Sequence, residues 1–153
     1  MDSKHFFVNL VGGNMFMPSL KNLARIKDTA TGKYLRATGQ DWYSVRNNSW
    51  SDFGTAYKKT HIGPRLKEAA QVLAALEWQE KFGKLKCPDN QGYRGEDGKW
   101  VWSEEITEYH RLRDERWKYS MENANIPDTW VIEEFVITGT SGDLVTPAKD
   151  WKP

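Results

Sequence analysis

Three histidines and several neighbouring carboxylates are the residues of this chain that could take part in catalysis or bind a metal. His5, His61 and His110 form no pair four residues apart on a helix, and no His-x-Ser/Thr repeat occurs. Neither a zinc protease nor a two-histidine phosphoesterase is therefore indicated. Glu104 and Glu108 would share one face of a helix and could hold a hard cation. Acidic residues at a helix N-terminus, which the helix dipole favours, explain them more simply.

The single cysteine, Cys87, is a further candidate catalytic residue, as a nucleophile. A cysteine–histidine pair is conceivable, but the glycine-rich surroundings of Cys87 do not indicate a rigid site. The standard glycine-rich nucleotide loops are absent, and residues 89–98 lack the oxygen-ligand spacing of a calcium loop. We therefore expect no catalytic residue, no metal and no cofactor, and we keep a small hydrolase only as a third hypothesis.

A group of aromatic and basic side chains lies between residues 34 and 59. Sheets that present aromatic rings beside Arg or Lys can stack bases and neutralise phosphates. About half of these aromatics must face a core, because side chains alternate along a strand. Core packing thus remains an alternative to nucleotide binding. The group comprises Tyr34, Arg36, Trp42, Tyr43, Arg46, Trp50, Tyr57, Lys58 and Lys59.

Size and composition indicate one globular domain. The chain has 153 residues, of which 39% are hydrophobic and 28% charged. Its net charge of +1 is uneven, because residues 1–63 hold nine of the 22 basic residues and only four of the 21 acidic ones. Such asymmetry can steer an anionic partner. It can equally reflect two faces that attract each other within the fold.

The single cysteine also bears on the compartment. One cysteine excludes an internal disulfide and a multi-cysteine zinc site, and it fits a reducing cytosol. We see no signal peptide and no apolar run of about 18 residues that could cross a membrane. We expect a soluble cytoplasmic protein that does not bind membranes.

The N-terminal half predicts short antiparallel strands followed by a helix. The expected strands cover residues 4–11, 23–27, 33–37, 42–45, 50–53 and 55–58. Pro64 fits the first turn of a helix that ends at Phe82, before Gly83. The apolar stripe expected on this helix is Leu66, Ala69, Ala70, Leu73 and Leu76.

The C-terminal half predicts a second helix and a late strand. We expect residues 83–102 to form a loop or hairpin insertion, closed by residues 96–98, with Ser103 as the N-cap of a helix that runs to about Asn123. Charged residues such as Arg111, Arg113 and Arg116 should lie on a solvated face of that helix. Its expected apolar positions are Ile106, Tyr109, Leu112, Trp117 and Met121.

Residues 130–138 should then form a strand, and residues 144–146 should pair back onto it. The resulting fold is α+β, with an antiparallel sheet, made of the N-terminal meander and a C-terminal strand, packed by two helices.

Short motifs between residues 25 and 70 resemble those of small, poorly characterised bacteriophage proteins. The shared pattern is an Ile-Arg/Lys stretch, a Thr-Gly turn followed by an aromatic, a Trp-Ser-x-x-Gly-x-x-Tyr element and a leucine-bearing helix. The matching residues are Ile26, Thr31, Gly32, Tyr34, Trp50, Ser51, Gly54, Tyr57 and Leu66. The resemblance spans about a third of the chain and implies a small protein made by a phage in the host bacterial cytoplasm. It implies no reaction.

Our leading hypothesis is a non-catalytic protein that binds and inhibits or modulates a host bacterial or defence component. The alternative is a protein that binds a nucleotide signal or nucleic acid through the basic aromatic sheet. The residues expected to bind are Arg36, Trp42, Arg46, Trp50, Tyr57 and Lys58 of the meander, together with Trp100 and Trp102.

Overall fold

The computed structural model describes residues 22–41, 44–53, 55–135 and 144–152. The strands are β1 (Leu23–Asp28), β2 (Lys33–Ala37), β3 (Ser49–Ser51), β4 (Tyr57–Lys58), β5 (Gly92–Arg94), β6 (Trp100–Trp102), β7 (Trp130–Glu134) and β8 (Leu144–Pro147). The helices are α2 (Lys59–Phe82), α3 (Glu104–Glu122) and the short 3-10 helix η2 (Ala148–Asp150). The expected strand at residues 4–11 lies outside the described residues, as do residues 42–43 and 136–138.

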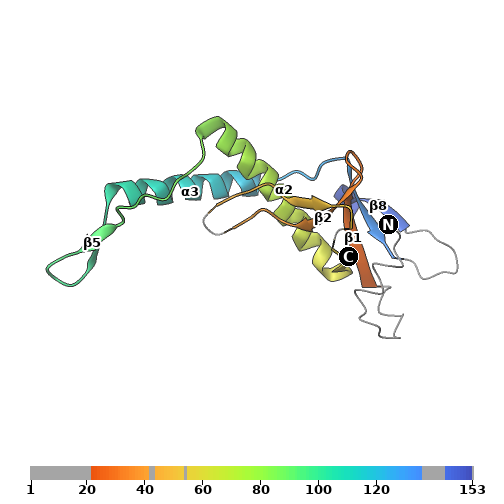
Figure 1. The fold of residues 1–153 in the computed structure, drawn as a ribbon, viewed down its shortest axis with the longest axis horizontal. Helices are drawn as coiled ribbons and strands as arrows, with labels where there is room; N and C mark the ends of the chain where they lie inside the picture. The colour runs from red at the N-terminus through yellow and green to blue at the C-terminus, as the bar shows by residue number, and fades with distance from the viewer. Residues whose placement is uncertain (1–21, 42–43, 54, 136–143, 153) are drawn as a thin grey trace.

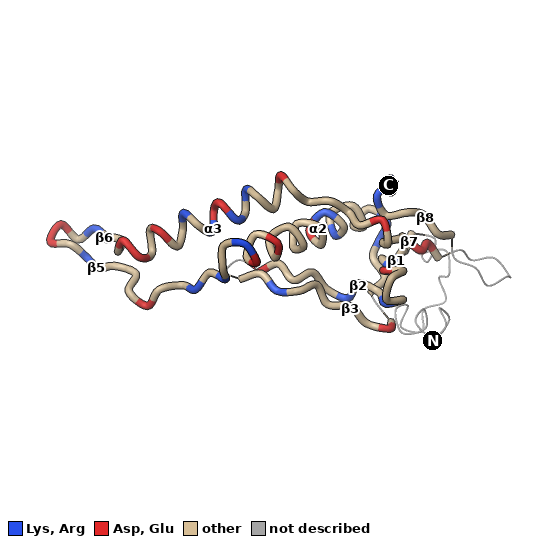
Figure 2. The backbone as a smooth tube through the Cα atoms, turned by 90° about the horizontal axis from the view of Figure 1, so that it is seen from above, with Lys and Arg blue, Asp and Glu red and all other residues tan. Residues whose placement is uncertain are grey.

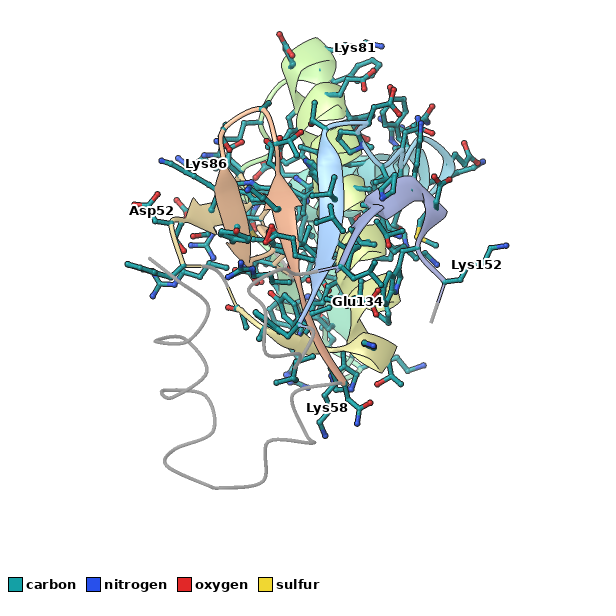
Figure 3. All side chains as sticks on the ribbon, turned by 90° about the vertical axis from the view of Figure 1, so that its right-hand side faces the viewer. Asp52, Lys58, Lys81, Lys86, Glu134 and Lys152 are labelled. Carbon is teal, nitrogen blue, oxygen red and sulfur yellow. The ribbon has the colours of Figure 1, made fainter. Side chains whose placement is uncertain are left out.

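The expected α+β fold is confirmed. Six strands form an antiparallel sheet in the order β3-β2-β1-β7-β8, and β4 pairs with the start of β1. The N-terminal strand β1 and the C-terminal strand β7 are central neighbours, with Ile26 opposite Ile132. Figure 3 views the sheet from its own end of the molecule, with helices behind it.

Helix α2 covers one face of this sheet. The apolar residues of β1 and β7 that face it alternate with polar ones, as a half-buried strand requires. Ala24, Ile26 and Ile132 are fully buried and pack against Ile62 and Leu66 of α2. A main core therefore lies between α2 and the sheet.

The opposite face of β1 and β7 carries a buried ion pair. Arg25 and Glu133 are cross-strand partners and are 8% and 6% exposed. The Arg25 guanidinium lies 2.9 Å from Glu133 Oε1, and the Tyr34 hydroxyl donates to the same oxygen at 2.9 Å. The ring of Tyr34 lies 4.1 Å from the Arg25 guanidinium carbon. Glu133 thus joins β1, β2 and β7.

Three of the short strands differ from the sequence expectation. Residue Val45 makes only an isolated bridge with Gln40, and β3 ends at Ser51 rather than at residue 53. Strand β4 is two residues long and pairs with β1 rather than with the preceding strand. Alternating side chains indicate an extended segment but do not indicate its neighbour, which tertiary packing selects.

Helix α2 begins five residues earlier than Pro64 predicts. It starts at Lys59, directly after β4, and places Ile62 in the main core. Pro64 therefore lies inside the helix, where its missing N–H removes one hydrogen bond. A helical conformation is disfavoured before proline by the Cβ of the preceding residue. That residue is Gly63, which has no Cβ, so the helix continues.

The expected apolar stripe on α2 is only partly correct. Leu66, Ala69 and Ala70 are buried, but Leu73 is 38% exposed and Leu76 is half-buried. The second half of α2 buries Val72, Ala75 and Trp78 instead, because it has left the sheet and packs beside α3. Because α2 packs first against the sheet and then against α3, its buried residues do not form a single apolar stripe along the whole helix.

Helix α3 also buries a face that differs from the expected one. Ile106 and Tyr109 are buried as predicted, but Trp117 and Met121 are 50% and 47% exposed. Arg116 and Ser120 take the buried positions and are 5% and 3% exposed. The prediction that Arg116 lies on a solvated face was wrong.

The molecule is elongated. In Figure 1, α3 extends away from the sheet and leads to β5 and β6 at the far end. No helix among the described residues is both long and apolar enough to span a membrane.

Candidate functional site

The meander residues expected to bind divide into exposed cations and packed aromatics. Arg36, Arg46 and Lys58 are exposed, and Figure 3 shows Lys58 directed away from the sheet. Trp50 packs against the main core, with its ring 5.3 Å from that of Trp130. Trp42 lies outside the described residues.

Tyr57 packs against the same core. Its hydroxyl donates to the carbonyl oxygen of Arg36 at 3.4 Å. Burial raises the pKa of Tyr57 above its ordinary value, and the nearby guanidinium of Arg65 partly opposes this shift. Tyr57 and Trp50 therefore support the core and the strand connections, and both side chains are half-buried there.

The two expected tryptophans of the insertion are exposed. Trp100 and Trp102 are 45% and 56% exposed, and their rings meet edge to face at 5.9 Å. They lie on one face of β6 because side chains alternate along a strand. Val101 lies on the other face, opposite Tyr93 of β5, and these two are 40% and 64% exposed. We call residues 92–102 the hairpin.

The structure does not bring the meander and the hairpin together. Figure 1 places the hairpin at one end of the molecule and the six-stranded sheet at the other, with the helices between them. Arg36 and Trp100 therefore cannot contribute to one continuous surface.

Glycines determine the shape of the hairpin. Gly92 has φ of 125°, and a Cβ at this position would lie 2.0 Å from the carbonyl oxygen of Val101. Gly98 adopts φ of 80° in the turn, where Gly95 N–H donates to the carbonyl oxygen of Lys99 at 2.7 Å. Both backbone conformations favour glycine, and the close approach at Gly92 permits no side chain.

Ser103 joins the hairpin to α3. Its hydroxyl accepts a hydrogen bond from Ile106 N–H at 3.1 Å, which confirms the predicted N-cap. The same hydroxyl donates to the carbonyl oxygen of Asn90 at 2.6 Å. On the other side, Trp102 lies edge-on to His110 of α3 at 5.6 Å. The hairpin is therefore attached to the helix through Asn90, which precedes β5, and through Trp102 of β6.

The hairpin carries mixed charge. It contains the cations Arg94 and Lys99 and the anions Glu96 and Asp97. Figure 2 shows both signs along the hairpin and along α3. A surface of this kind attracts neither polyanions nor polycations strongly.

The candidate catalytic residues are not assembled into a site. Cys87 is exposed, and its sulfur accepts a weak hydrogen bond from Gln91 at 3.6 Å. His61 is exposed on α2, whereas His110 contacts Trp102 and Tyr109. Glu108 pairs with Arg111, which lowers the pKa of that carboxyl. Across the described ranges, no three His, Cys, Asp or Glu side chains are grouped as metal ligands would be.

A groove that the sequence did not predict lies between α2, α3 and residues Gln40, Asp41 and Val45. It encloses about 790 Å³ and is lined by Val72, Arg116 and Met121, among others. The signal available in the sequence was the spacing of Ile106, Tyr109, Arg116 and Ser120, which places the last two on the buried face. The charge of Arg116 was the reason for interpreting this residue as solvated.

Comparisons with models of protein families, with curated proteins and with solved structures find no match to this chain.

Proposed function

We propose that this protein is a non-catalytic binding protein that docks onto a partner protein through its hairpin. The observation that carries the proposal is the exposure of Trp100, Trp102 and Tyr93 on a two-stranded sheet that pairs with no other described strand. Tryptophan and tyrosine dominate the binding energy of protein interfaces, where they fill pockets of the partner.

The position of the hairpin supports this role. It stands at the end of α3, remote from the sheet (Figure 1), so a partner can surround it on several sides. Its two strands are too few to have a core of their own, and a sheet that served only to pack within this chain would bury its tryptophans. The glycine and Ser103 contacts hold the rings in a fixed arrangement, which lowers the entropic cost of binding.

A protein is favoured over a nucleic acid as the partner of the hairpin. Nucleic-acid affinity depends on an excess of cations, and the hairpin holds two cations and two anions. The resemblance to phage proteins supports a bacterial host enzyme or defence component as the partner, bound and inhibited in the host cytoplasm.

The second hypothesis is nucleotide or nucleic-acid binding. The exposed cations Arg36, Arg46 and Lys58 support it. It predicts affinity that falls steeply with salt. Docking through the hairpin predicts little salt dependence, so a salt titration of the captured complex separates the two hypotheses.

The proposal is tested by replacing both hairpin tryptophans. The full-length chain and its W100A/W102A variant are used to capture proteins from a nuclease-treated bacterial lysate. The candidate partner is then purified, and its affinity is measured by calorimetry. We expect the double variant to bind about thirtyfold or more weakly, which corresponds to about 2 kcal/mol.

Phe53→Ala is the matched control, because Phe53 is 50% exposed and lies beside β3, away from the hairpin. It should leave the affinity unchanged. A W100F/W102F variant keeps the aromatic packing and checks that lost binding does not come from an unfolded hairpin. Equal capture by the wild type and W100A/W102A would refute the proposal.

A further inference from the structure

The groove between α2 and α3 has the size and lining of a small-molecule site. Its volume of about 790 Å³ lies within the range of roughly 300–1,000 Å³ that is common for ligand pockets. Apolar side chains line much of it, including Val45, Val72, Trp117 and Met121. The exposure of Trp117 and Met121, which was unexpected for α3, places apolar surface along this groove.

Arg116 is the buried charged residue among those that line the groove. The residue lines the cavity although it is only 5% exposed. The guanidinium donates to the neutral amide oxygen of Gln79 at 2.8 Å. Within the described residues, no carboxylate lies within ion-pairing distance, 4.0 Å, of Arg116.

A buried cation without a counter-charge is costly, because burial removes its hydration and a hydrogen bond to a neutral amide replaces only part of the lost interaction. Burial accordingly lowers the pKa of Arg116, and the positive charge of Arg113 lowers it further, against an opposing effect of Tyr109. Arginine remains charged at neutral pH despite such shifts. The groove therefore holds a permanent positive charge in an apolar surrounding.

The anionic side chains that line the groove do not neutralise this charge. Asp41 and Asp114 are exposed. Glu68 accepts a hydrogen bond from Thr38 and lies 3.7 Å from Arg65. These carboxylates are thus at the solvent edge or hydrogen-bonded elsewhere, whereas Lys67 and Arg113 add two further cations to the lining.

We propose that the groove binds a small organic anion, with its carboxylate or phosphate on Arg116 and its apolar body against Val72, Trp117 and Met121. The planar guanidinium suits both oxyanions, because it can donate two parallel hydrogen bonds to either. This site is separate from the hairpin, and it stands whether or not the hairpin binds a protein.

The first test compares two fluorescent probes that differ in charge. The anionic probe 8-anilinonaphthalene-1-sulfonate carries a sulfonate in place of the carboxylate or phosphate, and N-phenyl-1-naphthylamine has the same rings without it. The neutral probe is the more apolar one, so tighter binding of the anion can only reflect its charge. We expect the wild-type chain to bind the anionic probe more tightly. Equal affinity, or preference for the neutral probe, would overturn the proposal.

The second test assigns the charge effect to Arg116. Arg116→Gln should weaken binding of the anionic probe by about tenfold or more, since it removes a charge-assisted contact, and should leave the neutral probe unaffected. Arg111→Gln is the matched control: it removes the same charge from α3, but Arg111 pairs with Glu108 and Glu115 and does not line the groove. Equal losses in the two variants would count against the site.

Competition separates the two natural oxyanions. Phenyl phosphate and benzoate share an aromatic body, and each is titrated against the anionic probe on the wild-type chain. Displacement by phenyl phosphate alone assigns a phosphate ligand, and displacement by benzoate alone assigns a carboxylate. Displacement by both supports the shared oxyanion chemistry, whereas displacement by neither contradicts the proposal. This arm does not depend on whether the Arg116→Gln chain folds.

Discussion

The Ser103 hydroxyl donates to the carbonyl oxygen of Asn90 at 2.6 Å while it accepts from Ile106 N–H. One side chain thus completes the first turn of α3 and closes the base of the hairpin. The direction in which Trp100 and Trp102 project depends on this joint, because Trp102 is the residue immediately before it.

Removal of the joint should affect both elements. We expect Ser103→Ala to lower the free energy of unfolding by about 1 kcal/mol, as loss of an N-cap usually does, and to speed hydrogen exchange at Gly95 and Lys99. Urea unfolding and exchange measured by NMR check the two effects. Ser49→Ala, at an exposed position of β3, serves as the control. Unchanged exchange in the hairpin would show that Ser103 only caps the helix.

The two hairpin glycines should differ in their tolerance of a side chain. A Cβ at Gly92 would lie 2.0 Å from a backbone oxygen, whereas a Cβ at Gly98 would meet nothing within 4 Å. Gly92→Ala should therefore disorder the hairpin, while Gly98→Asn should preserve it, because asparagine tolerates positive φ. Cross-strand NMR contacts between residues 93 and 101 report the result. An intact hairpin in Gly92→Ala would contradict the structure.

The buried carboxylate Glu133 should be the more sensitive of two neighbouring acidic residues. Glu133→Gln removes the carboxylate that pairs with Arg25, and breaking a buried pair costs about 3–5 kcal/mol. Glu134 pairs with Lys59 at 2.8 Å in a more exposed position. Its replacement by Gln should cost about 1 kcal/mol or less. Denaturant unfolding of both variants decides this, and equal losses would count against the role of Glu133.

The hydrogen bond between Tyr119 and Glu77 should make the contact between α3 and α2 sensitive to pH. The Tyr119 hydroxyl donates to Glu77 Oε1 at 2.7 Å, and this bond lowers the pKa of Glu77 below its ordinary 4.5. A carboxyl with a lowered pKa stabilises the fold at pH values above its ordinary pKa. This contribution is lost as the pH falls through the folded-state pKa.

The stability difference between the wild type and Tyr119→Phe should therefore be larger at pH 7 than at pH 3. The same bond raises the pKa of Tyr119, so its contribution to stability is present below the ordinary tyrosine value and is lost at more alkaline pH. Tyr93→Phe, on the exposed hairpin, should show no such dependence. Thermal unfolding across this range measures the effect, and a constant difference would contradict it.

Local signals made several elements predictable from sequence. Gly83 ends α2, Ser103 begins α3, and the alternation after Trp130 predicts β7, because each of these signals acts on its own turn or strand. The hairpin followed from the glycine-rich turn near Gly98 for the same reason.

Features set by distant contacts were not predictable. Pairing of β1 with β7 depends on which strand the core selects, and α2 begins at Lys59 because Ile62 reaches that core. Arg116 was interpreted as solvated because its neighbours in sequence are charged. Its spacing from Ile106 and Tyr109 nevertheless places it on their face of α3, and α2 packs against that helix. The same distinction applies to the candidate sites. The binding role of Trp100 and Trp102 was expected from the sequence, whereas the groove between α2 and α3 was not.

The pairing of β1 with β7 has a consequence for synthesis of the chain. Arg25 and Glu133, which face each other in the sheet, are 108 positions apart. While the ribosome extends the chain, β1 can pair with β2 and β4, but its other edge has no partner until residue 134 has left the exit tunnel. An incomplete chain thus exposes a bare strand edge, which can associate with other nascent chains. Completion of this sheet is therefore a late event in the synthesis of the chain.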